Sequence, residues 1–243
     1  MNKTKATIVV YFALLIVEIA AELILYFHSI SYPLYLIKPL LMPVLALWAR
    51  VYANSKQLKL SKTVYLALLF AFFGDTALMF LKVKPDSFIL GLGCFLVTHL
   101  IYIYLFIELN TKKITTTIKR KPYYILPAFL YGLLLIGLLY QYNQANFMKI
   151  QAIVVIYAFV ILTMNLSAFS LYKIIEKQHF VLLFFGATLF VLSDSVIALS
   201  NFTPLFTGKE YMARIIIMSF YGVAQYLIVY GYIQANAKNH AVV

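Results

Sequence analysis

The chain has few charged residues and a single cysteine. Of its 243 residues, 12% are charged and 64% are hydrophobic, whereas a soluble domain has about 25% charged residues. The hydrophobic residues gather in runs long enough to cross a bilayer as helices. This composition excludes a soluble enzyme, a nucleic-acid binder and a disulfide scaffold. Cys94 is the single cysteine, so the chain can form neither an internal structural disulfide nor a thiolate metal cluster.

Eight apolar runs predict an all-α, polytopic membrane protein with eight transmembrane helices in a single domain over residues 1–243. The first run contains Glu18 and Glu22 and lacks a clear small-residue cleavage site. We therefore expect a retained first helix rather than a signal peptide. The expected helices cover residues 7–27, 34–53, 63–81, 87–108, 123–141, 150–172, 180–200 and 212–234.

The positive charges are distributed unevenly between alternate loops. The chain has 20 Lys and Arg residues against 8 acidic residues, which gives a net charge of +12. Most of these cations fall near the N-terminus and in the loops around 50–62, 112–121 and 173–177, which share one side of the membrane. Positive charge in short loops marks the cytoplasmic side. We therefore expect cytoplasmic N- and C-termini in a bacterial inner membrane, and no binding of nucleic acid.

Two parts of the chain carry similar local patterns. Asp75 and Asp194 lie in the third and seventh runs, each beside small residues. The runs that follow place an aromatic residue four positions before His99 and before Gln225. The sequence leaves open whether helices one to four and five to eight are two parallel repeats, which an axis along the membrane normal would relate.

Several ionisable side chains lie inside the apolar runs. Each costs about 2.5–3.5 kcal/mol or more to insert, so such groups usually face the interior of a bundle and serve a function. Their positions along the helices place them in one layer of the outer half of the membrane. We therefore expect a polar cavity that opens toward the outer face. The residues of this layer are Glu22, Lys38, Asp75, Asp194 and Arg214.

Each of these residues also has a structural explanation. Lys38 could extend to the headgroups, and Glu22 could pair with Lys38 to lower the cost of insertion. His99 and Gln225 are side chains that often hydrogen-bond between membrane helices, and Glu18 suits either a structural or a functional position. A structural explanation is weakest for Asp75 and Asp194, which are two acids at matching depth.

Two carboxyl groups in a site of low dielectric constant rarely both ionise, so one is expected to keep its proton. Such a pair suits general acid/base chemistry or a proton relay in a transporter. A metal site is disfavoured because only His99 could join the two acids as a ligand. The residues alone leave a hydrolase and a transporter nearly equal.

Five short motifs, in order and at compatible spacing, resemble those of the YhhN-like lysoplasmalogenase family of eight-helix membrane proteins. They cover nearly the full length of the chain. The motifs are Lys-Pro-Leu at 38–40, Gly-Asp-Thr-Ala-Leu at 74–78, the Phe95 to Tyr102 stretch with His99 and Leu100, the Gly186 to Ser195 stretch followed by Asn201, and Tyr-Gly-Val-Ala-Gln-Tyr-Leu-Ile at 221–228.

The resemblance implies hydrolysis of the vinyl ether bond of a lysoplasmalogen to a fatty aldehyde and glycerophosphoethanolamine or glycerophosphocholine, without a cofactor. Asp75 and Asp194 would share the acid and base roles. Some members of the family lack the second acid, whereas this chain keeps both. The supporting residues that the resemblance and the buried layer indicate are Glu22, Lys38, His99, Tyr102, Asn201, Arg214, Tyr221 and Gln225.

The expected partners are a lysophospholipid substrate and membrane lipids. Lys38 and Arg214 suit the phosphate of the substrate because they lie near the outer headgroup layer. The alternative hypotheses are a proton-coupled transporter of a small or lipid-like solute that uses the same Asp pair, and a lipid-binding or structural bundle.

Overall fold

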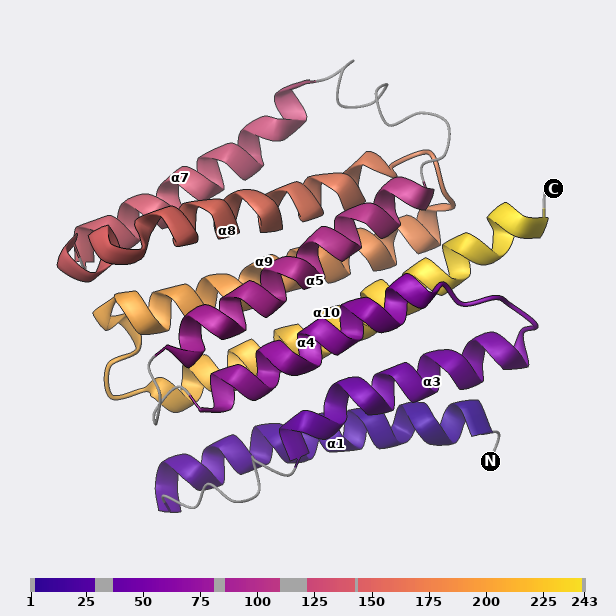
Figure 1. Cartoon of the computed structure of the whole chain (residues 1–243), viewed down its shortest axis with the longest axis horizontal. Coiled ribbons are helices and arrows are strands. Elements are labelled where there is room, and N and C mark those ends of the chain that lie inside the picture. Colours follow the sequence, from indigo (N-terminus) through magenta and orange to yellow (C-terminus); the bar gives the residue numbers. More distant parts are fainter. Residues whose placement is uncertain (1–2, 29–36, 81–85, 110–121, 143, 242–243) are drawn as a thin grey trace.

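The computed structural model describes residues 3–28, 37–80, 86–109, 122–142 and 144–241, and all regular secondary structure in these ranges is helical (Figure 1). This confirms the predicted all-α fold with eight long helices. Short 3-10 turns, η1 (Lys38–Leu40), η2 (Pro122–Tyr124) and η3 (Pro204–Phe206), precede three of them. The long helices are α1 (Lys3–His28), α3 (Leu41–Ser55), α4 (Lys62–Met79), α5 (Ser87–Leu109), α7 (Ile125–Tyr142), α8 (Gln144–Ser170), α9 (Lys177–Phe202) and α10 (Glu210–Ala241).

Seven of the helices are long and apolar enough to cross a membrane, and α3 is the exception. A continuous helix was expected from residue 34, but α3 begins only at Leu41 and has 15 residues. Its length is therefore about 22 Å, less than the roughly 30 Å of hydrocarbon in a bilayer. The start is displaced because Pro39 and Pro43 lack amide hydrogens and fit only the first turn of a helix. Residues 34–36 lie outside the described part of the chain.

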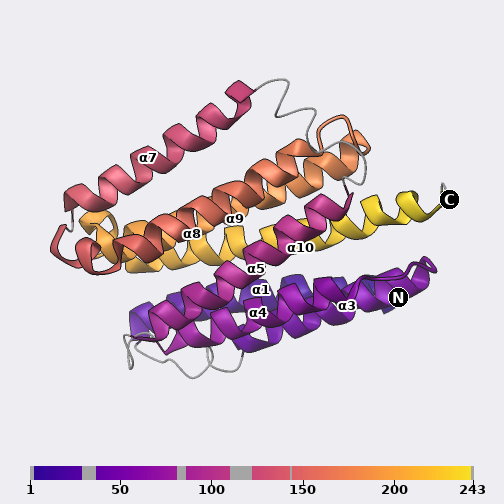
Figure 2. The ribbon, with the colours of Figure 1, turned by 45° about the horizontal axis from the view of Figure 1, so that its top comes forward.

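Seven of the long helices form a closed ring, and α7 packs on the outside of it. Each helix in the order α1, α3, α4, α5, α8, α9, α10 contacts the next, and α10 returns to α1. Among the long helices, α7 packs mainly on α8 and less closely on α9. Figure 2 shows it diverging from them toward its first residues. Helices α9 and α10 are the most enclosed. The ring therefore surrounds the side chains of the expected site.

Glycine allows the closest helix contacts near that site. A Cβ atom at Gly222 of α10 would lie 2.5 Å from the Leu15 side chain of α1, and one at Gly74 of α4 would lie 2.8 Å from the ring of Phe95. Small residues let membrane helices approach closely enough for dispersion contacts to hold them together. Gly74 is thus required for Phe95 to pack directly beside Asp75.

The outer surface is apolar, as expected for contact with lipid. Large hydrophobic side chains on several helices are well exposed, for example Phe159 on α8 at 71% and Leu134 on α7 at 63%. A water-soluble protein would not expose apolar side chains over most of its helices. The orientation of the bundle stays a prediction, since much of the expected cytoplasmic charge falls on 110–121, outside the described residues. The relation of helices one to four and five to eight as parallel repeats also stays a prediction.

Candidate active site

Asp75 is enclosed by aromatic rings near the end of α4. Asp75 is only 3% exposed. Its Oδ2 accepts a hydrogen bond of 2.7 Å from the hydroxyl of Tyr221 on α10. The ring of Tyr221 packs edge-on against Phe95 and Phe190, with centroids 5.7 and 5.4 Å away. A buried carboxyl group needs such a partner because the unpaired group would be costly in an apolar interior. Tyr221 therefore fixes the position of Asp75.

Asp194 lies on α9 in a different environment, with two side chains bound to one oxygen. Its Oδ2 accepts a 2.5 Å hydrogen bond from the hydroxyl of Tyr157 on α8 and lies 3.2 Å from Nε2 of His99 on α5. The same Nε2 atom lies 3.0 Å from the Tyr157 hydroxyl. His99 is fully buried, and its ring packs edge-to-face with the ring of Phe190, with the ring centroids 4.7 Å apart. Three helices thus converge on this carboxyl group.

Two cavities adjoin Asp194. One, of about 50 Å³, lies between α7, α8 and α9 and is lined by Tyr131, Leu162 and Val191 among others. The other, of about 40 Å³, lies between α4, α5, α8 and α9 near Phe95. Tyr157 borders both of them. Their walls are mostly apolar, which differs from the polar cavity expected from the sequence. Among the polar side chains at these cavities, Asp194 and Tyr157 are hydrogen-bonded to each other and Tyr131 is hydrogen-bonded to Ser195.

The two acids are close but are not in direct contact through a hydrogen bond. Phe190 touches both Tyr221 and His99, so an aromatic ring stands between the partners of one acid and those of the other. Asp75 still lies within electrostatic range of Asp194 and of Lys38. Each acid can therefore affect the charge of the other across an apolar layer, where electrostatic interactions are weakly screened.

Helix α10 gives the relative depth of these groups. The Ser193 hydroxyl donates to the carbonyl oxygen of Ile217 at 3.1 Å, so Asp194 lies near the level of Ile217. Tyr221, which holds Asp75, is about one turn further along α10, and its side chain leans back toward Ile217. Arg214 lies about one turn before Ile217 along α10, on the side of Ile217 opposite to Tyr221. The two acids therefore lie at similar depth, with Arg214 nearer the end of the bundle.

The cations occupy that end of the bundle. Nη1 of Arg214 lies 2.8 Å from Oε2 of Glu22, and the Glu22 side chain is 7% exposed against 33% for Arg214. A pair of Glu22 with Lys38 was one structural explanation for these residues, and the observed ion pair of Glu22 is with Arg214. Lys38, half-buried in η1, lies within electrostatic range of Asp75 and Glu18. The late start of α3 is what places Lys38 at this depth.

Tyr102 and Gln225 form a separate contact deeper in the bundle. The Tyr102 hydroxyl donates to Oε1 of Gln225, and both residues are fully buried. Nε2 of Gln225 and Nδ1 of His99 have no hydrogen-bond partner among the described residues. Buried donors and acceptors are usually paired. These two nitrogen atoms are therefore free to hydrogen-bond a ligand or water, which packing between helices alone does not explain.

Asn201 does not join the site. It is exposed near the end of α9, and its amide donates to the carbonyl oxygen of Ile197 in the same helix at 2.8 Å. The other candidate residues all lie inside the ring of helices. Among the described residues, no group of three or more His, Cys, Asp or Glu side chains could hold a metal ion.

Sequence reasoning did not find Tyr157 and gave Glu18 too little weight. Tyr157 is one of 20 tyrosines and has no motif around it, so only the fold shows that it binds Asp194. Glu18 is 0% exposed, neither of its carboxyl oxygens has a partner among the described residues, and Lys38, Glu22 and Asp75 surround it electrostatically. Its position one turn before Glu22 was the available signal.

Comparison with known protein families shows that the model of the YhhN family matches residues 34–232. This segment contains both acids, His99, Lys38 and the part of α10 with Tyr221, which binds Asp75. No curated protein and no solved structure was found to match the chain.

Proposed function

Since the chain belongs to the YhhN family, we propose that it is a membrane-embedded lysoplasmalogenase. It hydrolyses the vinyl ether bond of a lysoplasmalogen to a fatty aldehyde and glycerophosphoethanolamine or glycerophosphocholine. The observation that carries this proposal is the position of Asp194. It is a carboxyl group at the edge of two apolar cavities, held by His99 and Tyr157. A lipid chain and an acid can meet at that point.

The reaction needs a proton donor in an apolar site. A carboxyl group transfers its proton to the β-carbon of the vinyl ether, and the cation that forms is an oxocarbenium ion. Water adds to this cation, and the resulting hemiacetal breaks down to the aldehyde and the free hydroxyl of the glycerol. A positioned acid contributes about 10²–10⁴-fold to such a step. A nearby carboxylate stabilises the cation, as in glycosidases.

In this proposal Asp194 meets the reacting atoms, because it borders the cavities. Tyr157 and His99 orient its carboxyl group and supply a route for its proton. Asp75 acts through its charge, since it is buried, bonded to Tyr221 and lines neither cavity, while Asp194 stays within its electrostatic range. Tyr221 supports Asp75 from α10.

The cations at the end of the bundle suit the phosphate of the substrate. Lys38 is the stronger candidate, because it is half-buried and has no ion pair among the described residues. Arg214 already pairs with Glu22, but a third of its side chain is exposed and can bind a second anion. In the bilayer we assign this end to the outer leaflet, with both termini cytoplasmic, as the distribution of Lys and Arg predicts.

The experiment is an assay of aldehyde release by the purified protein. A lysoplasmalogen should yield one aldehyde per molecule, and the saturated-ether analogue should yield none, since it has no double bond to protonate. Heat-inactivated protein is the control for spontaneous hydrolysis. Absence of aldehyde from the native protein over a range of detergents and pH values would overturn the proposal.

A second candidate function is proton-coupled transport. Glu18 favours it, because a buried carboxyl group without a hydrogen-bond partner near Asp75 could take part in a proton relay. This candidate predicts proton flux coupled to solute uptake in proteoliposomes, and loss of that flux in Glu18→Gln. Aldehyde release without flux would favour the hydrolase.

A further inference from the structure

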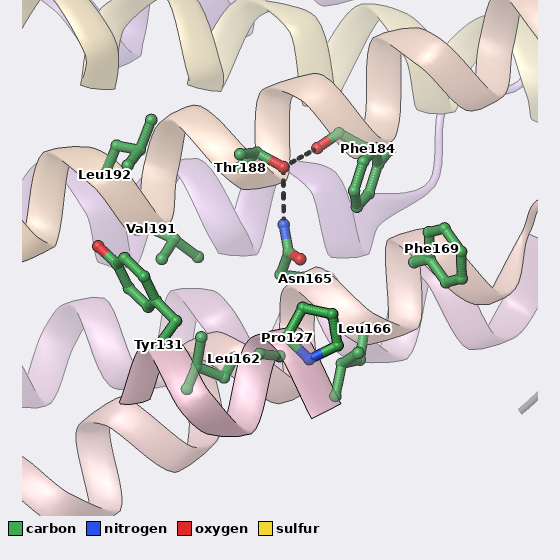
Figure 3. A pocket seen from close by; sticks show the side chains of 11 residues that line it. Pro127, Tyr131, Leu162, Asn165, Leu166, Phe169, Phe184, Thr188, Val191 and Leu192 are labelled. Atoms are coloured by element: carbon green, nitrogen blue, oxygen red, sulfur yellow. Dashed lines mark hydrogen bonds between the residues drawn. The ribbon is translucent and has the colours of Figure 1, made fainter. Parts of the chain in front are cut away.

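An apolar groove runs between α7, α8 and α9, beside the candidate active site. Its cavity has a volume of about 350 Å³, within the usual size range of a small-molecule pocket. Figure 3 shows Leu162 and Phe169 of α8 and Phe184 of α9 around it, with Pro127 of α7 on the outer side. The groove therefore has walls on three helices and can enclose an elongated apolar group.

The few polar groups of this groove are bound to one another. The amide of Asn165 donates to the hydroxyl of Thr188 at 2.9 Å, and that hydroxyl donates to the carbonyl oxygen of Phe184 at 2.8 Å (Figure 3). Paired polar groups do not need a polar ligand. The chemistry of the wall therefore fits a hydrocarbon chain rather than a headgroup.

The groove leads to Asp194. The small cavity at Asp194 and the groove share Tyr131, Leu162 and Val191 as lining residues, so the two spaces are neighbours. Tyr131 stands at their junction, and its hydroxyl lies 2.7 Å from Oγ of Ser195, the residue after Asp194. The side chain of Tyr131 thus forms the constriction between the groove and the acid.

The direction of the groove matches the shape of a single-chain lipid. Its lining on α9 runs from Leu192, two residues before Asp194, back to Phe184, a rise of roughly 12 Å along the helix. Arg214 lies on the other side of Asp194, toward the opposite end of α9. A molecule with its phosphate near Arg214 and Lys38 would place its ether bond at Asp194 and its chain in the groove.

Helix α7 is suited to be the outer wall because it is loosely attached. Gly132 and Leu139 are its only buried residues in the described range. A Cβ atom at Gly132 would lie 2.9 Å from Cδ1 of Leu162, so this glycine is the point at which α7 touches α8 beside the constriction. A chain can reach the groove from the surrounding lipid along the exposed side of α7.

We propose that this groove binds the single hydrocarbon chain of the lysolipid substrate, with its far end at Phe169 and Phe184 and its ether end past Tyr131 at Asp194. The proposal rests on the proposed function, which supplies the substrate class. Its occupant is the substrate chain and not a chain of an ordinary two-chain membrane lipid, because the groove adjoins the small cavity that the candidate catalytic acid borders.

The experiment uses photolabelling in nanodiscs of a two-chain phosphatidylcholine. Two probes are saturated-ether lysophosphatidylethanolamines that cannot be hydrolysed, one with a diazirine at the last carbon of the chain and one with a diazirine close to the ether oxygen. The first should label residues 162–169 and 184–188, and the second should label residues 191–198. Equal labelling of lipid-exposed faces, for example at Val9 and Ile16 of α1, would overturn the proposal. So would labelling seen only in detergent without two-chain lipid.

A matched pair of variants tests the groove by size. Val191→Trp fills the junction of the two cavities, whereas Val155→Trp makes the same change on the exposed face of α8. Val191→Trp should reduce labelling by about tenfold, because the larger side chain displaces about two methylene groups of the probe from the groove and their burial is lost. Val155→Trp should leave labelling unchanged. Equal labelling in both variants and the native protein would contradict the proposal.

The two proposals fail in different ways. Aldehyde release by the native protein together with labelling outside the groove would overturn the groove and keep the enzyme. Labelling in the groove without aldehyde from any lysoplasmalogen would overturn the enzyme and keep the groove as a site for a single lipid chain. Labelling of the native protein supplies this answer even where Val191→Trp does not fold.

Discussion

The two acids of the bundle have the same side chain but different surroundings. Asp75 accepts one hydrogen bond, from Tyr221, and aromatic rings surround its partner. Asp194 contacts both Tyr157 and His99 and lies at the edge of two cavities. The difference teaches that access to a ligand, rather than burial or charge alone, separates an acid that can touch a substrate from one that acts at a distance.

The largest effect is expected at Asp194. Asp194→Asn keeps the size of the side chain but removes the proton donor, so aldehyde release should fall by about 10²–10⁴-fold. The kcat for lysoplasmalogen hydrolysis measures this change. Binding of the saturated-ether analogue to the same variant is the control, and it should be retained. Native kcat in Asp194→Asn would remove the carboxyl mechanism.

A smaller effect is expected at Asp75. Asp75→Asn removes a charge that acts on the site across an apolar layer, so kcat should fall by about tenfold while KM stays near its native value. Steady-state kinetics of the two Asn variants, measured in the same detergent, give the comparison. An effect larger than that of Asp194→Asn would identify Asp75 as the acid.

Lys38 should affect binding more than chemistry. Lys38→Gln removes a cation near the end of the site, and KM should rise by about tenfold because a charge-assisted contact with phosphate is lost. Lys62→Gln, an exposed change at the start of α4, is the matched control. If the two variants have the same KM, the phosphate does not bind at Lys38.

The tyrosine partners of the acids offer a matched pair of smaller changes. Tyr157→Phe removes a hydrogen bond to Asp194 and should lower kcat by about fivefold. Tyr221→Phe removes the bond to Asp75 but keeps the ring that packs on Phe190, so its effect on kcat should be less. The ratio of the two kcat values is the measurement. A stronger effect in Tyr221→Phe would reverse the assignment of roles.

The smallest effect is expected at Asn201. Its exposed amide bonds only to Ile197 of its own helix, so Asn201→Ala should leave kcat and KM within about twofold of native, since surface changes of this kind alter little. A loss of activity at Asn201 would show that the site extends to the end of α9.

Much of the fold and part of the site could be predicted from the sequence. Helix positions follow from the length of the apolar runs. Because charge is rare in a membrane, the sequence also singled out buried ionisable residues, and the structure shows several of them within electrostatic range of one another. Tyr157 could not be predicted, since its role depends on α8 lying beside α5 and α9. The late start of α3 depends on Pro39 and Pro43, which an apolar run defined by hydrophobicity alone does not take into account.

The pairing of Glu22 and the form of the cavities also depend on tertiary contacts. Glu22 pairs with Arg214, a residue 192 positions away, and this pair forms because α1 packs against α10. The groove between α7, α8 and α9 leaves no mark in the sequence, because apolar side chains that face a cavity and those that face lipid are the same residue types.

The most direct test of the central claim is the single-turnover rate of aldehyde formation by Asp194→Asn and Asp75→Asn, each saturated with lysoplasmalogen. Saturation removes differences in binding, so the ratio of the rates reports the chemical step. We predict that Asp194→Asn is slower than Asp75→Asn by about tenfold or more, as expected for a proton donor compared with a charge at a distance. Equal rates, or a slower Asp75→Asn, would contradict the account.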